Sequence, residues 1–154
     1  MDYICRMNDF LEYVKRQFQV DRRLILLYVI IYFIWGMGMD AFGTYIEVAR
    51  FTYWWQVITV YILYMVPISL LLRNLPFYAQ YAYGLVAMCF LEFGGYALES
   101  SYAYPDNMID QLFNVRNFSL AMALFFALYF PAGNWIVDKI YRLIFNTDPD
   151  LTKQ

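Results

Sequence analysis

The sequence contains no histidine, only two cysteines, and charged residues at just 16% of its 154 positions. Without imidazole there is no His-ligated zinc or haem, no Ser-His or Cys-His nucleophile and no histidine proton shuttle. Cys5 and Cys89 form no CxxC pair, so the sequence predicts two unpaired thiols and no redox centre. Because 11 Lys and Arg stand against 13 Asp and Glu, the chain has no basic excess for binding nucleic acid.

Apolar residues are abundant: 62% of the chain is hydrophobic and 22% is aromatic. This composition predicts an all-α integral membrane protein. Crossing a hydrocarbon core of about 30 Å takes roughly twenty helical residues. Four segments of the chain are long enough to do so, namely residues 24–46, 53–72, 75–98 and 118–138. Short links within residues 24–141 pair these four transmembrane helices as two antiparallel hairpins.

The longer outer loop, residues 100–117, has helical character of its own. Asp106 offers a capping acid, and apolar residues follow it at helical spacing up to Phe113. This pattern predicts a short interfacial helix in the loop.

The basic residues predict how the helices are oriented. If the N-terminus is inside, nine of the eleven lie on the inner side, and only Arg50 and Arg116 lie outside. Both termini, including a polar tail at residues 142–154, are therefore expected on the cytoplasmic or matrix side of a bacterial or mitochondrial inner membrane. Residues 1–23 carry acids that a signal peptide lacks, and they predict an amphipathic helix. Such a helix either lies in the membrane interface, which is the favoured placement, or packs on a partner.

A weak internal repeat relates the two predicted hairpins. Asp40, Gly43 and Glu47 in the first recur at identical spacing in the second, as Glu92, Gly95 and Glu99. Duplication of a two-span unit and chance in so biased a composition both explain the pattern. A duplicated unit would be parallel, with its pseudo-twofold axis along the membrane normal.

The repeat gathers acids at the outer edge of the membrane. In each pair the acids are seven residues apart, so both are expected on one helix face, with Arg50 and Arg116 at the same level as counter-ions. One interpretation is an outward-open polar vestibule that accepts a proton, a cation or a cationic headgroup. The other is a set of structural ion pairs between helices, formed by Asp40, Glu47, Glu92, Glu99, Arg50 and Arg116.

Glycine and proline predict how the helices pack. Small residues in the outer halves let helices approach closely, and these positions are Gly36, Gly38, Gly43, Gly94 and Gly95. Pro67 and Pro131 each remove a helical hydrogen bond and predict kinks. The many tyrosines carry hydroxyls that need partners within the hydrocarbon, which favours a binding partner, a polyaromatic pocket or bound lipids.

Three functions remain open from the sequence. The favoured one is a non-catalytic accessory or assembly subunit of a larger membrane complex, because no catalytic motif is present. The second is a proton- or cation-coupled carrier that uses the outer carboxylates. The third is an intramembrane terpenoid or lipid isomerase or cyclase, in which a carboxylic acid donates the proton and aromatic rings stabilise a cation. No cofactor or metal is predicted, and the expected partners are membrane lipids with other membrane subunits or further copies of this chain.

Overall fold

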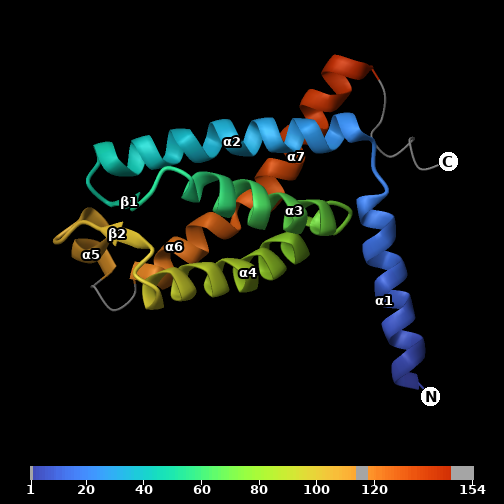
Figure 1. The fold of residues 1–154 in the computed structure, drawn as a ribbon, viewed down its shortest axis with the longest axis horizontal. Helices are drawn as coiled ribbons and strands as arrows, with labels where there is room; N and C mark the ends of the chain where they lie inside the picture. The colour runs from blue at the N-terminus through green and yellow to red at the C-terminus, as the bar shows by residue number, and fades with distance from the viewer. Residues whose placement is uncertain (1, 114–117, 147–154) are drawn as a thin grey trace.

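The computed structural model describes residues 2–113 and 118–146, and most of these residues are helical. The elements in chain order are α1 (Asp2–Phe18), α2 (Arg22–Tyr45), β1 (Ala49–Phe51), the π-helix η1 (Ile58–Met65), α3 (Val66–Leu72), α4 (Phe77–Ala97), β2 (Ser101–Ala103), α5 (Met108–Phe113), α6 (Phe118–Ala127) and α7 (Tyr129–Phe145). The helices α2, η1–α3, α4 and α6–α7 form a bundle. Both strands and α5 lie at one end of it, which we call the strand end, and α1 extends from the other end (Figure 1).

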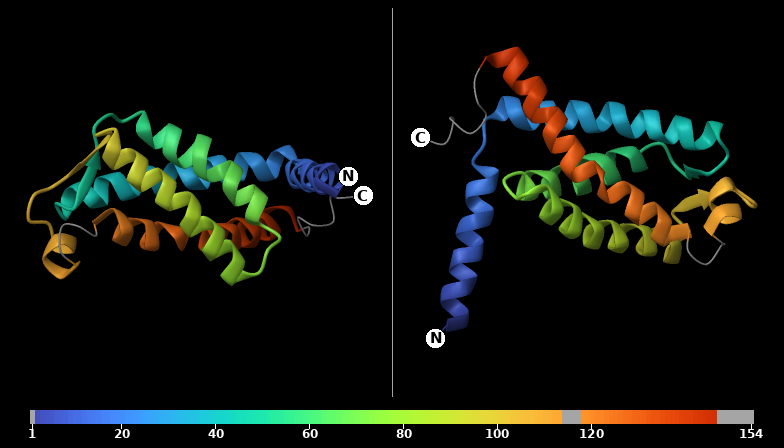
Figure 2. Two further views of the ribbon diagram at one scale, coloured as in Figure 1. Left: turned by 90° about the horizontal axis from the view of Figure 1, so that it is seen from below. Right: turned by 180° about the vertical axis from the view of Figure 1, so that it is seen from behind.

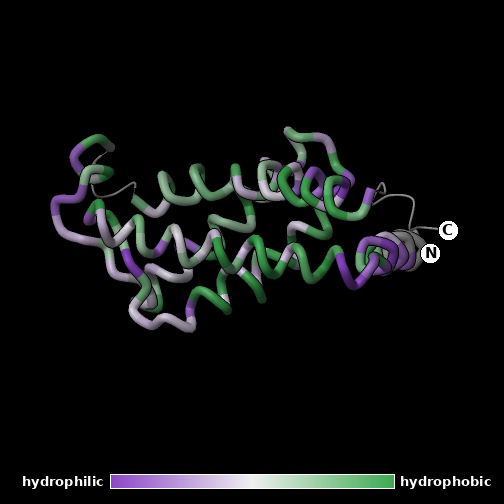
Figure 3. Tube along the Cα trace, turned by 90° about the horizontal axis from the view of Figure 1, so that it is seen from above, coloured by the Kyte–Doolittle hydropathy of each residue, from purple (hydrophilic) through white to green (hydrophobic). Residues whose placement is uncertain are grey.

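Two helices of the described chain are long and apolar enough to cross a membrane, namely α2 and the continuous α6–α7 segment, residues Phe118–Phe145. Hydrophobic residues fill most of the middle of the bundle, and hydrophilic segments gather toward its two ends (Figure 3). The apolar helix Ile58–Leu72 is shorter.

Most helix boundaries lie close to the predicted ones, and the last helix differs most. The ends of α2 and α4 fall within two residues of the predicted spans 24–46 and 75–98. In contrast, α7 continues to Phe145, seven residues past the predicted end and into the predicted tail. Its final turns are amphipathic rather than uniformly apolar, with Val137 and Tyr141 buried against the bundle.

Both prolines lie where the helical hydrogen-bond pattern changes. Pro67 is in the first turn of α3, directly after the π-helical segment η1. Pro131 lies four residues after Ala127, the last residue of α6, and it has no N–H to donate to the Ala127 carbonyl. The second predicted span is also shorter than expected, because residues 53–55 form a turn before the helix begins.

The two strands pair at positions that the internal repeat makes equivalent. They pair antiparallel, with Arg50 opposite Tyr102 and Ala49 opposite Ala103. Arg50 and Tyr102 are 52 residues apart, the same offset that separates Asp40 from Glu92. A residue that pairs with its own repeat equivalent marks the position of a twofold axis. Figure 2 shows that α2 and α4 run in the same direction, so an axis that relates these two helices would follow the length of the bundle.

The ends of α2 and α4 repeat the same cap. The backbone N–H of Val48 bonds the Gly43 carbonyl at 2.9 Å, and the N–H of Ser100 bonds the Gly95 carbonyl at 3.0 Å. Between these bonds Glu47 and Glu99 adopt φ values of 52° and 51°. Such a left-handed residue closes a helix with a Schellman-type turn. The structure therefore supports the duplication more strongly than the few matching letters do.

The short loop helix α5 is present, but its cap differs from the prediction. The Asn107 carboxamide oxygen accepts the Ile109 N–H at 3.0 Å, so Asn107 caps the helix in place of Asp106. Asp106 itself takes a turn conformation with φ 57°. The Asn107 carboxamide, one residue later in the chain, is the group within hydrogen-bonding distance of the Ile109 N–H.

Several tyrosine hydroxyls within the bundle find acceptors in the chain itself. Tyr28 donates to the Asn134 Oδ1 at 2.8 Å, Tyr64 donates to the Ala87 carbonyl at 2.6 Å, and Tyr32 is hydrogen-bonded to Ser69. These three hydroxyls are therefore satisfied within the bundle and do not need a partner molecule.

The N-terminal helix α1 runs crosswise to the bundle, away from its side (Figures 1 and 2). Its C-terminal half is attached to the loop end of α3, where the Tyr13 hydroxyl donates to the Leu71 carbonyl at 2.8 Å and Asn74 donates to Gln17 at 3.0 Å. The α2 helix then begins behind Asp21, whose carboxylate accepts the Arg23 N–H. This hydrogen bond is the main cause that lowers the pKa of Asp21, with a further contribution from the Tyr141 hydroxyl.

Candidate functional site: a chamber at the strand end

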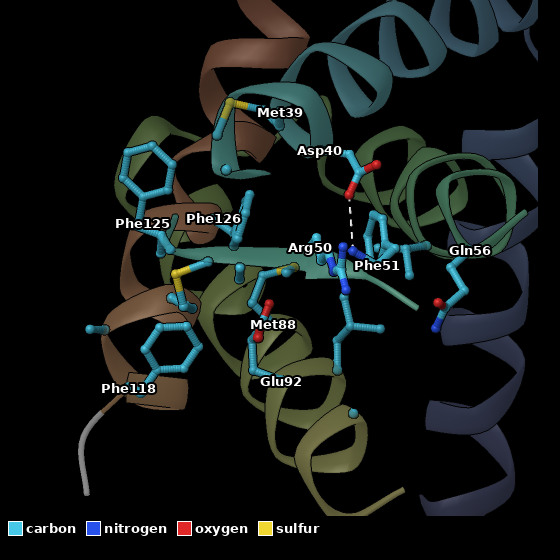
Figure 4. Close-up of a pocket in the computed structure, with 18 of the residues that line it drawn as sticks. Met39, Asp40, Arg50, Phe51, Gln56, Met88, Glu92, Phe118, Phe125 and Phe126 are labelled. Atoms are coloured by element: carbon cyan, nitrogen blue, oxygen red, sulfur yellow. Dashed lines mark hydrogen bonds between the residues drawn. The ribbon is translucent and has the colours of Figure 1, made fainter. Parts of the chain in front are cut away.

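A chamber of about 930 Å³ lies among the helices at the strand end, and it is partly open to the surface. It is lined by α2, β1, η1, α4, α5 and α6. Most of its wall is apolar, with contributions from Met39, Phe51, Tyr61, Met88, Phe118 and Phe126 (Figure 4). Its volume is at the upper end of the range for small-molecule pockets, about 300–1,000 Å³. We call this space the chamber.

Two carboxylates face this apolar space, one from each half of the repeat. Asp40 comes from α2 and Glu92 from α4, and both line the chamber (Figure 4). Asp40 accepts the Phe51 N–H at 2.9 Å, which ties the end of α2 to β1. For Glu92, the described residues provide no hydrogen-bond partner. The equivalent positions of the repeat therefore carry one anchored and one unanchored acid.

Arg50 does not act as the counter-ion that the sequence suggested. Its guanidinium lies over the rings of Tyr102 and Tyr104, 5.2 Å and 5.7 Å from their centroids. Within the part of the chain that the structure describes, no salt bridge reaches Asp40 or Glu92. The salt bridge found there joins Arg16 to Glu12 on α1. Arg116 lies outside the described residues.

The four predicted acids do not share one site. Glu47 and Glu99 follow the ends of their helices in the left-handed conformation, so the seven-residue spacing that put them on the face of Asp40 and Glu92 no longer applies. Both are exposed, and neither lines the chamber. The predicted polar vestibule is thus a largely apolar chamber with two acids. Among residues 2–113 and 118–146, no three His, Cys, Asp or Glu side chains gather to hold a metal ion.

The predicted packing glycines divide into two groups. A Cβ at Gly36 would lie 2.7 Å from the Tyr61 ring, and one at Gly43 would lie 2.7 Å from the Ala49 carbonyl oxygen. At Gly38 and Gly94 a Cβ would meet nothing within 4 Å. Gly36 and Gly43 therefore allow close approach, and Gly43 and Gly95 also supply the carbonyls of the two helix caps.

Comparison with protein-family models, with curated proteins and with solved structures finds no match to this chain. The chamber itself therefore provides the basis for a functional proposal.

Sequence reasoning missed the polar contacts that fix the helices beneath the chamber. Asn134 on α7 donates to the Gln80 Oε1 on α4 at 2.8 Å, and Gln80 in turn donates to the Leu75 carbonyl at 2.7 Å. Both side chains are buried. The available signal was the single amide side chain in each of two mainly apolar spans, since buried polar groups within a membrane segment are expensive unless they are paired.

Proposed function

We propose that the protein is a four-span integral membrane protein that binds a hydrophobic small molecule in the chamber. The observation that carries the proposal is the partly open apolar space of about 930 Å³ that both predicted hairpins line. A four-helix bundle whose only task is assembly has no need of so large an apolar opening between its helices, because packed protein elements normally leave few voids.

The membrane setting is supported by what the bundle exposes. Besides the two long apolar helices, large apolar side chains project from its outer faces, among them Leu26, Ile34 and Leu63, which are 59%, 65% and 66% exposed. A water-soluble monomer rarely exposes contiguous apolar patches larger than a few hundred Å². Hydrocarbon around the bundle accounts for this surface.

The crosswise direction of α1 fits the same setting. Phe10, Leu11 and Phe18 are exposed on this helix, and Lys15 and Arg16 are exposed beside them. A helix that carries both kinds of side chain and runs across the bundle lies parallel to the bilayer, at the inner surface in the predicted orientation.

Labelling with a membrane-impermeant maleimide tests the topology. In a Cys5→Ser/Cys89→Ser background, single cysteines replace the exposed residues Thr52 and Asn74, which lie in loops at opposite ends of the bundle. We expect Thr52→Cys to react in intact cells and Asn74→Cys to react only after the membrane is permeabilised. Equal reactivity of both cysteines in intact cells would contradict a spanning bundle.

Ligand binding is tested by filling the chamber. The Ala121→Trp variant places an indole on its wall, and Ala82→Trp places one on the exposed face of α4 as the matched control. The measurement is native mass spectrometry of the purified protein, together with extraction of any retained hydrophobic molecule. We expect wild type and Ala82→Trp to retain it and Ala121→Trp to lose it. Retention that is the same in all three proteins would reject the chamber as the binding site.

The accessory-subunit role remains a prediction with its own measurement. A stable, monodisperse monomer in mild detergent would count against it, and co-purification of further membrane subunits at fixed stoichiometry would support it.

A further inference from the structure

The chamber contains two carboxylates that are not paired with any described cation. Asp40 and Glu92 both line it, and neither forms a salt bridge with a described residue. Among the described lining residues, Arg50 is the sole cation, and its guanidinium lies against Tyr102 and Tyr104. Carboxylates that face an apolar wall are costly unless a cation or a proton accompanies them.

Aromatic rings surround the same space. Phe51, Tyr61 and Phe126 contribute to its wall, and they come from three different elements, β1, η1 and α6. The face of an aromatic ring attracts a cation, and the attraction grows when water is excluded. Carboxylates together with ring faces form the arrangement by which proteins recognise substituted ammonium groups.

We propose that the hydrophobic molecule bound in the chamber carries a cationic ammonium headgroup, which lies between the carboxylates of Asp40 and Glu92. This inference rests on the proposed function and names the chemical class of its ligand. The headgroup sits toward the strand end, and the apolar part of the ligand occupies the wall toward Met65 and Met88. Because Asp40 is held by the Phe51 N–H, its carboxylate is fixed in position, while the carboxylate of Glu92 adjusts to the ligand.

The internal repeat explains why the chamber receives two acids, because Asp40 and Glu92 occupy its equivalent positions. A twofold axis through the strand pair brings Asp40 and Glu92 to the chamber from two separate helices. A single cation between them interacts with both. Glu47 and Glu99 are equivalent to each other in the same way, but they lie outside the chamber and provide matched controls.

The experiment compares two probes that differ in charge alone. One is a radiolabelled long-chain alkyl trimethylammonium, and the other is the same chain ending in a neutral tert-butyl group. Binding to the full-length protein in nanodiscs is measured by scintillation proximity, and the signal from empty nanodiscs of the same lipid composition is subtracted. We expect wild type to bind the cationic probe roughly tenfold more tightly than the neutral one.

The variants assign the preference to the two acids. Asp40→Asn/Glu92→Gln should bind both probes with equal affinity and should keep the wild-type affinity for the neutral probe. Glu47→Gln/Glu99→Gln should keep the full preference for the cation. The single variant Glu92→Gln, which removes no described hydrogen bond, should lose part of the preference and provides the test if the double variant does not fold.

The outcomes separate the two proposals. Equal binding of both probes to wild type, or a cation preference that persists in Asp40→Asn/Glu92→Gln, overturns the cationic headgroup and leaves the chamber as a site for neutral molecules. Failure of wild type to bind either probe overturns the chamber as a binding site as well.

Discussion

Asn134 joins helices from both halves of the chain through one carboxamide group. Its oxygen accepts the Tyr28 hydroxyl from α2, and its amide group donates to Gln80 on α4. Tyr28 and Asn134 are 106 residues apart in the sequence. Buried hydrogen bonds of this kind contribute modestly when they are formed and cost more when one partner is removed.

Replacing Asn134 with alanine removes both of these bonds. We expect Asn134→Ala to lower the free energy of unfolding by about 2–3 kcal/mol, since the buried Gln80 carbonyl oxygen loses its described donor. The measurement is thermal unfolding in detergent. Leu143→Ala is the control, because Leu143 lies on the same helix and is 81% exposed, and it should change the free energy by no more than about 0.5 kcal/mol. Equal stability of the two variants would contradict a structural role for Asn134.

At the scale of the helix, the glycines show that a sequence pattern does not identify the positions where helices pack closely. Gly38 belongs to a Gly-Met-Gly group that predicts close packing, yet a Cβ there would meet nothing within 4 Å. Gly84 stands alone between larger residues, yet a Cβ there would come within 3.0 Å of the Phe130 ring of α7. The difference depends on which face of each helix meets a neighbour, and composition does not reveal that face.

Alanine substitutions at these two glycines should have opposite effects on stability. Gly84→Ala forces Phe130 to move and should destabilise the bundle by about 1–3 kcal/mol. Gly38→Ala replaces a mid-helix glycine by a better helix former without a clash, and it should stabilise the bundle by up to about 1 kcal/mol. Thermal unfolding of both variants in the same detergent checks the signs. If Gly84→Ala were as stable as the wild type or more stable, α4 and α7 would not pack as described.

At the scale of the whole molecule, β1 and β2 connect the two halves of the chain. Each strand directly follows the same helix cap, and their pairing register places an approximate twofold axis between Arg50 and Tyr102. The second half departs from the symmetry by inserting α5 between β2 and α6. The chamber lies beneath this strand pair and receives one acid from each half.

A disulfide across the strands tests this register. Ala49 lies directly opposite Ala103, and opposed residues of an antiparallel pair have Cβ atoms about 4.5–5.5 Å apart, a spacing from which a disulfide can form with little movement. In a Cys5→Ser/Cys89→Ser background, Ala49→Cys/Ala103→Cys should cross-link under mild oxidation. A tag-cleavage or mobility assay detects the cross-link. Ala49→Cys/Tyr102→Cys is the control, since adjacent strand positions point to opposite faces and this pair should stay reduced. Cross-linking of the control pair alone would show that the register is different.

The sequence by itself determined the helical composition, the approximate bounds of α2 and α4, the loop helix and the positions of Asp40 and Glu92 in the repeat. These follow from hydropathy, periodicity and capping, which are properties of neighbouring residues. The tertiary structure alone decided that Glu47 and Glu99 leave the shared face, that Arg50 lies on tyrosine rings, and that the acids border an apolar chamber. Those outcomes depend on contacts between residues tens of positions apart, where packing geometry selects one partner among many that are chemically equivalent.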